Sequence, residues 1–438
     1  FVCSQNDTIP FRTESTSLPM NENSLPGFVA SRSETLNVAD IYQISDGVPY
    51  TADLSFDRAT GYRTRSMLLV PMNDRDGEVI GVLVLINCKP EPDTPLTNFD
   101  RVGSFSERHA DVARSIASQA AVAIENYRLY REIRSLFDGF VEAAVTAIEA
   151  RDPTTGGHSH RVAALTTTLA QACHDNSEGP FREVRFSARE LTELHYAAML
   201  HDFGKVGVRE AVLLKAEKLY GWEMDQIASR FRLAAMQTML EGIRAHIETG
   251  AITEKLSSLK QDLALIRRLN RPRKPLNEEE VRELIGVAER WSLLELNEPI
   301  LQPRELERLC IPRGTLDPEE RRQIEEHVTH TYQFLKVIPW TRDLRQVPEL
   351  AYAHHEKLDG TGYPRGLSAT EIPFGAKLMT ICDIFDAVTA SDRPYKPAID
   401  IERAVKILRA EAADGKLASE AVELFCAKRL WKSVLDTD

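Results

Sequence analysis

Residues 354–364 read HHEKLDGTGYP, and this string decides how the C-terminal two thirds of the chain is interpreted. Two adjacent histidines precede an acidic residue and a loop with two glycines and a Tyr-Pro pair. Before the string, Val347, Leu350 and His354 recur at helical spacing, and His355 lies at the edge of the same stripe. We therefore expect a helix whose apolar face carries both imidazole rings toward the protein interior.

A second histidine-acid string, HDFGK, occupies residues 201–205. His201 and Asp202 follow the apolar stretch YAAML, which predicts that they are buried, and Lys205 lies one helical turn further on the same face. The dipeptide alone carries little information, because His174–Asp175 repeats it within the polar stretch CHDNSEGP. We expect that other pair to be solvated.

A third helix is predicted over residues 377–390, where KLMTICDIFDAVTA is apolar nearly all round and should be buried. Asp383 and Asp386 nevertheless share one of its faces. A bare buried carboxylate costs roughly several kcal/mol unless a cation or hydrogen bonds compensate. A metal ion is the simplest compensation. Capping, or pairing with a basic side chain, is the alternative, and it is stronger for Asp386 than for Asp383.

Two more histidines fall on apolar stripes of predicted helices. His158 lies on the stripe of HSHRVAALTTTLA, and His327 lies near the centre of the stripe in RRQIEEHVTHTYQFL. His160 points to the opposite side, and His330 falls toward an edge. A histidine that merely fills a core is the alternative in each case, and we favour metal ligation for His158 and His327 alone.

Five histidines and two aspartates that converge on one helical core are a set of donors typical of a metal centre. Mixed imidazole and carboxylate ligands suit iron, manganese, nickel or zinc. A carboxylate such as Asp202 can bridge two metals, and two metals roughly 3.5–4 Å apart would hold a bridging hydroxide and clamp a phosphoryl oxygen. The residues therefore predict metal-assisted phosphoester hydrolysis.

These strings resemble the bacterial HD-GYP domain over about residues 140–415, apart from an insertion. The resemblance rests on the strings at 201–205 and 354–364, on Arg151–Asp152–Pro153, on the Thr-Gly-Gly-His158 segment and on residues 392–396, DRPYK. It implies an all-α domain, placed over residues 140–438, with phosphodiesterase activity on cyclic di-GMP, a bacterial second messenger. It also implies a centre of two or three metals.

The resemblance assigns roles to individual residues. Asp202 and Lys205 would be catalytic, with Lys205 contacting the scissile phosphate or the metal-bound water. Gly362 and Tyr363 would belong to the lip that leaves the site open to a dinucleotide. The substrate contacts would further include Arg393, Lys396 and Asp386. The metal ligands would be His158, His201, Asp202, His327, His354, His355 and Asp383.

Two features depart from the family pattern. Members with three metals carry Glu four residues before the histidine that matches His158, whereas this chain has Thr154. We therefore expect two divalent metal ions, iron or manganese before nickel or zinc, and linear pGpG rather than GMP as the product. The second departure is the charged, helical insertion at about 215–318, which could cover the active-site mouth or mediate dimer contacts.

The insertion contains a basic run, LIRRLNRPRKP, at residues 265–275. We interpret this run as a solvated face or linker in preference to a phosphate-binding segment, because most such runs are solvated.

The N-terminal part has a different, mixed character. SMLLVPM and VIGVLVLIN flank NDRDGE, which predicts two buried strands joined by a tight Asp-Gly turn. With the following ASQAAVAIENYRLYREI, these strands resemble a GAF sensory domain over about residues 1–128, an α+β fold with an antiparallel sheet and flanking helices. The alternatives are a domain that senses an unknown small ligand and one that is purely structural or dimerising.

One long helix is predicted over residues 106–151, overlapping both domains. Its apolar residues recur every three or four positions, which requires a partner surface. Parallel self-association into a homodimer would supply one, and packing on the chain's own domains is the alternative. The stripe comprises Val112, Ile116, Ala120, Ala123, Tyr127, Tyr130, Ile133, Phe137, Val141, Ala144 and Ile148.

Composition limits the classes of partner. The 438 residues carry 54 Lys+Arg against 66 Asp+Glu, and a net charge of -12 argues against general binding of duplex nucleic acid. No apolar run approaches the roughly 20 residues that span a bilayer, so we expect a cytoplasmic chain without membrane insertion. Six scattered cysteines without a CxxC pair suggest reduced thiols. The chain opens with Phe1, so upstream sequence is expected to have been removed.

Three hypotheses for function follow. The first is a GAF-regulated cyclic di-GMP phosphodiesterase, with GGDEF-domain proteins as further partners. The second is a receptor that binds the dinucleotide without hydrolysing it, and the third is a phosphohydrolase for another nucleotide. The complete ligand set and Lys205 argue against the second, and the string at 354–364 argues against the third.

Overall fold

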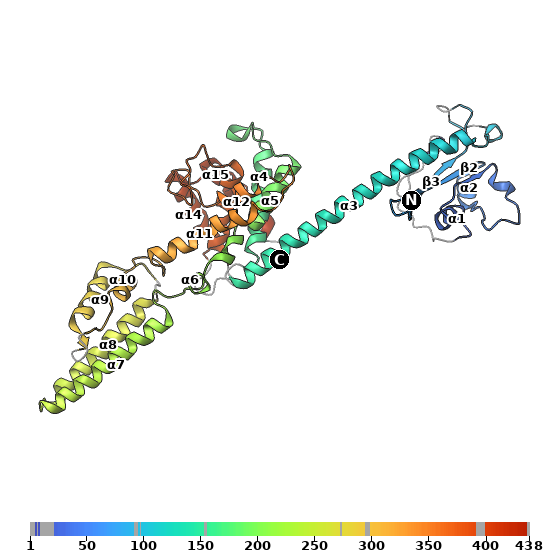
Figure 1. The fold of residues 1–438 in the computed structure, drawn as a ribbon. Helices are drawn as coiled ribbons and strands as arrows, with labels where there is room; N and C mark the ends of the chain where they lie inside the picture. Colours follow the sequence, from blue (N-terminus) through green and yellow to red (C-terminus); the bar gives the residue numbers. More distant parts are fainter. Residues whose placement is uncertain are drawn as a thin grey trace. The chain divides into compact units, whose positions relative to one another are not determined.

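The computed structural model of the chain describes residues 5–6, 8, 22–91, 95–96, 98–152, 156–271, 274–293, 298–390 and 399–435. It separates into two compact units, Phe1–Asp138 and Gly139–Asp438. Figure 1 shows both along the chain, and each is described here by itself.

The first unit is built on a small antiparallel sheet. Three strands pair in the order β1-β2-β3, and Leu69 of β2 faces Val84 of β3 across the ladder. The predicted tight turn joins β2 to β3, and Gly77 in it has φ of 86°, a left-handed conformation that glycine adopts without a steric penalty. The elements are α1 (Leu25–Arg32), β1 (Leu36–Val38), η1 (Ile41–Gln43), α2 (Ser55–Thr60), β2 (Met67–Asn73), β3 (Val79–Ile86), η2 (Phe99–Arg101) and α3 (Glu107–Arg151).

The two faces of this sheet pack against different helices. Because side chains alternate along a strand, Leu69 joins a core with Leu25 and Val29 of α1, whereas Leu68 and Val70 face the other way. The second face packs against Ala110, Ala113 and Ala117 of α3. The predicted α+β fold of this part is confirmed.

The long helix exists as predicted, but its buried face differs from the predicted stripe. Small alanines pack on the sheet, whereas Val112 and Ile116 are more than half exposed. Alanine allows the helix to approach the sheet closely, so the larger apolar side chains point away from it. Toward the C-terminal end of α3, Val141 and Ile148 are buried, as the predicted stripe requires.

The second unit is helical, which confirms the predicted class. Helix α4 packs on α5 and α13, and α11 packs on η5 and α12. Capping boxes begin α5 at Ser187 and α11 at Asp317. The elements around the site are α4 (His158–His174), η4 (Gly179–Phe181), α5 (Ala188–Leu200), η5 (Phe203–Gly207), α6 (Glu210–Leu213), α11 (Pro318–Leu335), α12 (Val347–Tyr352), α13 (Phe374–Thr389), α14 (Ile401–Ala413), α15 (Ser419–Ala427) and α16 (Lys432–Leu435).

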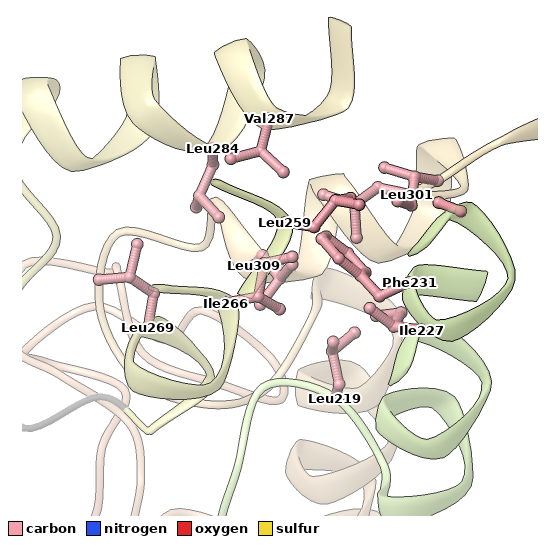
Figure 2. Close-up of a cluster of buried hydrophobic side chains, with 12 residues drawn as sticks. Leu219, Ile227, Phe231, Leu259, Ile266, Leu269, Leu284, Val287, Leu301 and Leu309 are labelled. Carbon is pink, nitrogen blue, oxygen red and sulfur yellow. The ribbon is translucent and has the colours of Figure 1, made fainter. Parts of the chain in front are cut away.

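The region predicted to be an insertion has a hydrophobic core of its own. Figure 2 shows Ile227 and Phe231 packed with Leu259 and Ile266 in this core. A two-stranded ladder between β4 and β5 was not expected from a pattern that looked helical throughout. The elements are α7 (Gly221–Arg244), α8 (Thr249–Asn270), α9 (Glu278–Arg290), β4 (Ser292–Leu293), β5 (Glu298–Pro299) and α10 (Pro303–Leu309).

Within the described ranges, every helix is too short or too polar to cross a bilayer.

Candidate metal centre

Five histidines and two aspartates that are distant in sequence meet in the second unit. His158 begins α4, and His201 and Asp202 follow α5 directly. His327 lies in α11, His354 and His355 follow α12, and Asp383 lies in α13. In three overlapping groups of three, the donor atoms all lie within 4.8 Å of one another: His327 with His354 and His355, His158 with His201 and Asp383, and His201 with Asp202 and His354.

Three of the imidazoles are held in the same way. The Nδ1 atoms of His201, His327 and His354 each lie 2.6 Å from a backbone carbonyl three residues earlier. A carbonyl only accepts, so each Nδ1 carries the proton and each Nε2 keeps a free lone pair. These three Nε2 atoms are buried and find no hydrogen-bond partner among the described residues. Orientation of the outer nitrogen by a carbonyl is the arrangement found in metal-binding histidines.

His158 is oriented by a carboxylate instead. Its Nδ1 lies 2.7 Å from Oδ2 of Asp386, and its Nε2 lies 3.2 Å from Oδ1 of Asp383. Burial alone would lower the pKa of His158, but the hydrogen bonds to Asp383 and Asp386 raise it to about 9. The inner nitrogen of His158 therefore faces the same space as the other three.

Asp202 is the central carboxylate. Its Oδ1 lies 3.2 Å from Nε2 of His327, and its Oδ2 lies 3.5 Å from Nε2 of His201 and 2.9 Å from Nζ of Lys205. Burial would raise the pKa of Asp202, but the Lys205 ammonium, His201 and His327 hold it well below its usual range. The group is thus an anion whose two oxygens face different imidazoles, as a bridging ligand requires.

Asp383 is the second inward carboxylate. Besides His158, it faces Nε2 of His201 and Nδ1 of His355, both at 3.8 Å. Burial would raise the pKa of Asp383, whereas the hydrogen bond to His158 and the neighbouring imidazoles lower it far below its ordinary value. Burial lowers the pKa of His354 and His355, so both rings are neutral at pH 7.

These observations show that the residues fit divalent metal ions. The imidazoles of His201, His327 and His354 keep a free lone pair on Nε2, and the carboxylates are ionised, as metal ligands need. His158, whose pKa two carboxylates raise to about 9, would release its proton when a metal binds. Buried, unpartnered nitrogens that face buried carboxylates also describe a site whose polar groups require a cation. The donor set, imidazole with carboxylate, suits borderline first-row metals.

Close backbone packing brings the HDFGK segment against α11. A Cβ at Gly204 would lie 1.9 Å from the backbone oxygen of His327, so only glycine fits there. Thr331 completes the contact, because its hydroxyl accepts from Gly204 N at 2.8 Å and donates to His201 O at 2.9 Å. The glycine in the string therefore positions Asp202 opposite His327.

The loop after His355 is organised by a buried carboxylate. Glu356 accepts hydrogen bonds from the backbone N–H groups of Arg365 and Leu367, both at 2.8 Å. Gly362 packs directly on the backbone of Glu356, and the Tyr363 ring lies 4.7 Å from the His355 ring. The structure thus places Tyr363 beside the donor cluster.

Lys205 lies between two acidic residues. Its Nζ is 2.9 Å from Asp202 and 3.1 Å from Asp152. Burial would lower the pKa of Lys205, but these two carboxylates raise it above its ordinary value. Asp152 belongs to the Arg151–Asp152–Pro153 string, and the sequence offered no reason to give it this role.

Other predicted residues lie elsewhere. Both oxygens of Asp386 are occupied by His158 and by Arg161 at 2.7 Å, and the side chain is buried, so this carboxylate positions a histidine rather than facing an open site. His160 pairs at the surface with Glu142. Of the pair expected to be solvated, Asp175 is exposed, and His174 is half-buried and accepts a hydrogen bond from Phe186 N. Arg393, Lys396 and Thr154 lie outside the described residues.

Comparisons with known proteins agree with this organisation. Residues 6–124 match the GAF domain family model, and residues 299–419 match an HD domain model. The HD match begins near the end of the insertion and includes His327, His354, His355 and Asp383.

Curated relatives match the chain over part of their length. It is 27% identical to the 3'3'-cGAMP-specific phosphodiesterase 3 of Vibrio cholerae over 62% of this chain and 36% of the relative. It is 37% identical to a cyclic di-GMP phosphodiesterase of Thermotoga maritima over 30% of this chain and 34% of the relative. It is 33% identical to the V. cholerae 3'3'-cGAMP-specific phosphodiesterase 1 over 25% of each chain. The chain spans about a third or less of these relatives.

An HDG"Y"P protein of Bdellovibrio bacteriovorus aligns with 61% of this chain and 77% of its own, at 13% identity and a TM-score of 0.22. The two family matches confirm the assignment made from the sequence strings: the chain carries a GAF domain followed by an HD domain.

Proposed function

We propose that the chain is a metal-dependent phosphodiesterase that hydrolyses cyclic di-GMP. The observation that carries this proposal is the convergence of three buried, unpartnered Nε2 atoms with two ionised carboxylates. The names of the curated relatives add the substrate class, cyclic dinucleotides that contain guanylate. 3'3'-cGAMP is the second candidate, because two of those relatives are named for it.

The residues that would hold the metals are those of the donor cluster. His327 and His355 with His354 would serve one ion, His158 and His201 with Asp383 would serve the other, and Asp202 would lie between them. When bound, divalent cations lower the pKa of water and polarise a phosphoryl oxygen. We expect two metal ions rather than three, and we expect them to be iron or manganese.

Lys205 would act on the substrate phosphate. Its ammonium is held in the cluster by Asp202 and Asp152, and these two carboxylates raise its pKa above the ordinary value. A fixed cation that faces a phosphate stabilises the negative charge that grows in the transition state. Linear pGpG is the proposed product.

Regulation would pass through α3. The exposed apolar residues of this helix include Leu129, Ile133, Leu136 and Phe140, spaced four, three and four positions apart. This is the a/d spacing of a two-stranded coiled coil, and Asn126 falls at an a position, where a polar residue fixes register. We propose that two copies pair along this seam and that a change in the GAF domain alters that pairing.

The decisive test is turnover by the full chain. Purified protein loaded with Mn²⁺ or Fe²⁺ is incubated with cyclic di-GMP or 3'3'-cGAMP, and products are separated by chromatography. We expect pGpG from cyclic di-GMP, no turnover by Asp202→Ala, and full turnover by the matched control His160→Ala, a surface histidine. Tight binding without turnover by the loaded wild-type chain would overturn the proposal in favour of a receptor.

A further inference from the structure

The basic run at 265–275 is not a linker. Its first residues form the last turns of α8, and Ile266 and Leu269 are buried in the core of the insertion (Figure 2). The backbone of Arg267 and Arg268 therefore belongs to a packed helix, although their side chains are exposed, and Arg271 follows directly after the helix.

These arginines line a cavity of about 780 Å³ in the insertion. Its charged lining consists of five basic and two acidic side chains: Lys218, Arg267, Arg268, Arg271 and Lys274, with Glu217 and Glu280. The lining is therefore positive by three charges in a chain whose net charge is -12. Small-molecule sites typically occupy 300–1,000 Å³.

Lys218 is the most unusual member of this lining. Its side chain is 1% exposed, and its Nζ donates to the backbone oxygen of Leu309 at 2.6 Å. Among the described residues, no carboxylate lies within ion-pair distance of this ammonium. A buried charge without a counter-ion is costly, and one backbone carbonyl offsets only part of that cost.

The two acidic residues do not neutralise the remaining cations. Glu217 pairs with Arg271 at 2.5 Å, and Glu280 is shared between Arg268 at 3.3 Å and Lys274 at 3.4 Å. Arg267 has no ion pair within the described part of the chain. The cavity is thus lined by more basic than acidic side chains.

We propose that this cavity binds a polyphosphate anion carried by a nucleotide, at a site separate from the metal centre. Guanidinium and ammonium groups together are the donors that recognise phosphate, and three excess charges match two or more phosphate groups. A single phosphate would leave most of 780 Å³ empty, whereas Met224 and Leu276 in the lining offer an apolar surface to a base.

The competing interpretation is structural. Leu309 is the last residue of α10, so Lys218 could serve only to cap that helix, with the arginines solvated. This interpretation requires no ligand. It predicts that Arg267 behaves like any exposed arginine of the insertion.

The test is calorimetric titration of the full chain with pyrophosphate and, separately, with GTP. Metals are removed with EDTA, because the proposed site uses none and the metal centre then cannot hold the probe. The test variant is Arg267→Ala combined with Lys274→Ala, two exposed side chains whose loss leaves the core intact. The matched control is Arg282→Ala, an exposed arginine of α9 that does not line the cavity.

We expect one equivalent of probe to bind per chain, with affinity at least tenfold weaker in the double variant and unchanged in the control. GTP binding more tightly than pyrophosphate would identify the nucleotide as the source of the phosphates, and equal affinity would identify inorganic polyphosphate. Absence of saturable binding by both probes, or equal binding by the double variant and wild type, overturns the proposal.

Discussion

Nδ1 of His158 lies 2.7 Å from Oδ2 of Asp386, although 228 positions separate the two residues in the chain. This contact joins the first residue of α4 to α13 and fixes which nitrogen of His158 faces the metal centre. Arg161 holds the other oxygen of Asp386. The carboxylate therefore sets the orientation of a proposed metal ligand, and its own two oxygens are occupied by His158 and Arg161.

Substituting Asp386→Asn should weaken metal binding by about 10–100-fold, because the outer partner of a metal-bound histidine fixes its tautomer and basicity. Competition with a chromophoric chelator measures this change. Asp359→Asn, which alters an exposed carboxylate bonded to Thr361, is the control and should leave the affinity unchanged. Equal metal affinity in both variants would show that Asp386 has no such role.

Replacing Lys205→Met should lower turnover by a factor of about 100 or more, since it removes a fixed cation from the reacting phosphate. Metal content, measured by atomic emission, should remain close to wild type, because the ligands stay in place. A parallel loss of metal and turnover would instead make Lys205 a structural partner of Asp202 and Asp152.

Adding a methyl group at Gly204 should destabilise the second unit by about 3 kcal/mol, since the new Cβ would overlap the backbone of α11. Gly139→Ala is the opposite case: no atom lies within 4 Å of its Cβ position, and alanine favours the helix by about 0.5–1 kcal/mol. Urea unfolding measures both changes. The interpretation fails if Gly204→Ala unfolds at the wild-type urea concentration.

The metal-free protein should be less stable at pH 5.5 than at pH 7.5. Burial lowers the pKa of His355 to about 3 in the folded state, whereas its pKa in the unfolded chain is about 6.5. The unfolded chain therefore takes up a proton on this histidine as the pH falls from 7.5 to 5.5, and the folded chain does not. This difference lowers the free energy of unfolding by about 1.4 kcal/mol. The pKa of His158 is raised to about 9, so His158 has the opposite effect. Its contribution to the free energy of unfolding rises by nearly the same amount as the pH falls from 7.5 to 5.5. These two effects nearly cancel, so His201 and His354 decide whether the protein is less stable at pH 5.5. Burial lowers the pKa of both, which destabilises the fold at the lower pH.

Urea unfolding followed by tryptophan fluorescence, to which Trp431 stacked on Phe385 of α13 contributes, measures this pH difference. His354→Gln removes one of the two deciding groups and should reduce it. Higher stability at pH 5.5 would mean that the imidazoles are charged in the folded state.

Placing a charge on the apolar seam of α3 should dissociate the proposed dimer. Leu136→Glu puts carboxylates opposite each other at a d position, whereas the control Ser135→Glu puts them on the outer face. Light scattering coupled to size exclusion measures the mass. A monomeric wild type, or a dimer that survives Leu136→Glu, would contradict the coiled coil.

Helical periodicity was sufficient to predict most of the donor cluster. His158 and His327 lie on the apolar stripes of their helices, and each has an Nε2 that faces a buried carboxylate. His160 was assigned to the opposite side of the same helix and lies at the surface. Periodicity works here because the burial of a helix face determines which histidines point inward.

Other features depend on contacts that no local pattern records. Asp152 and Asp386 touch Lys205 and His158 across long sequence separations, so their positioning roles became visible only in the fold. The alanines by which α3 packs on the sheet lie outside the predicted stripe, because alanine carries little hydrophobic signal although its small size allows close packing.

The insertion leaves the helical domain and returns to it at nearly the same point. Lys215, where it begins, pairs with Glu320 of α11 at 2.6 Å, and the hydroxyl of Thr315 donates to Lys215 O at 3.0 Å. The ends of this long excursion already touch, so its length adds little to the entropy of closing the loop. We therefore expect that another segment with the same end-to-end distance could replace the region without displacing His201 on one flank or His327 on the other.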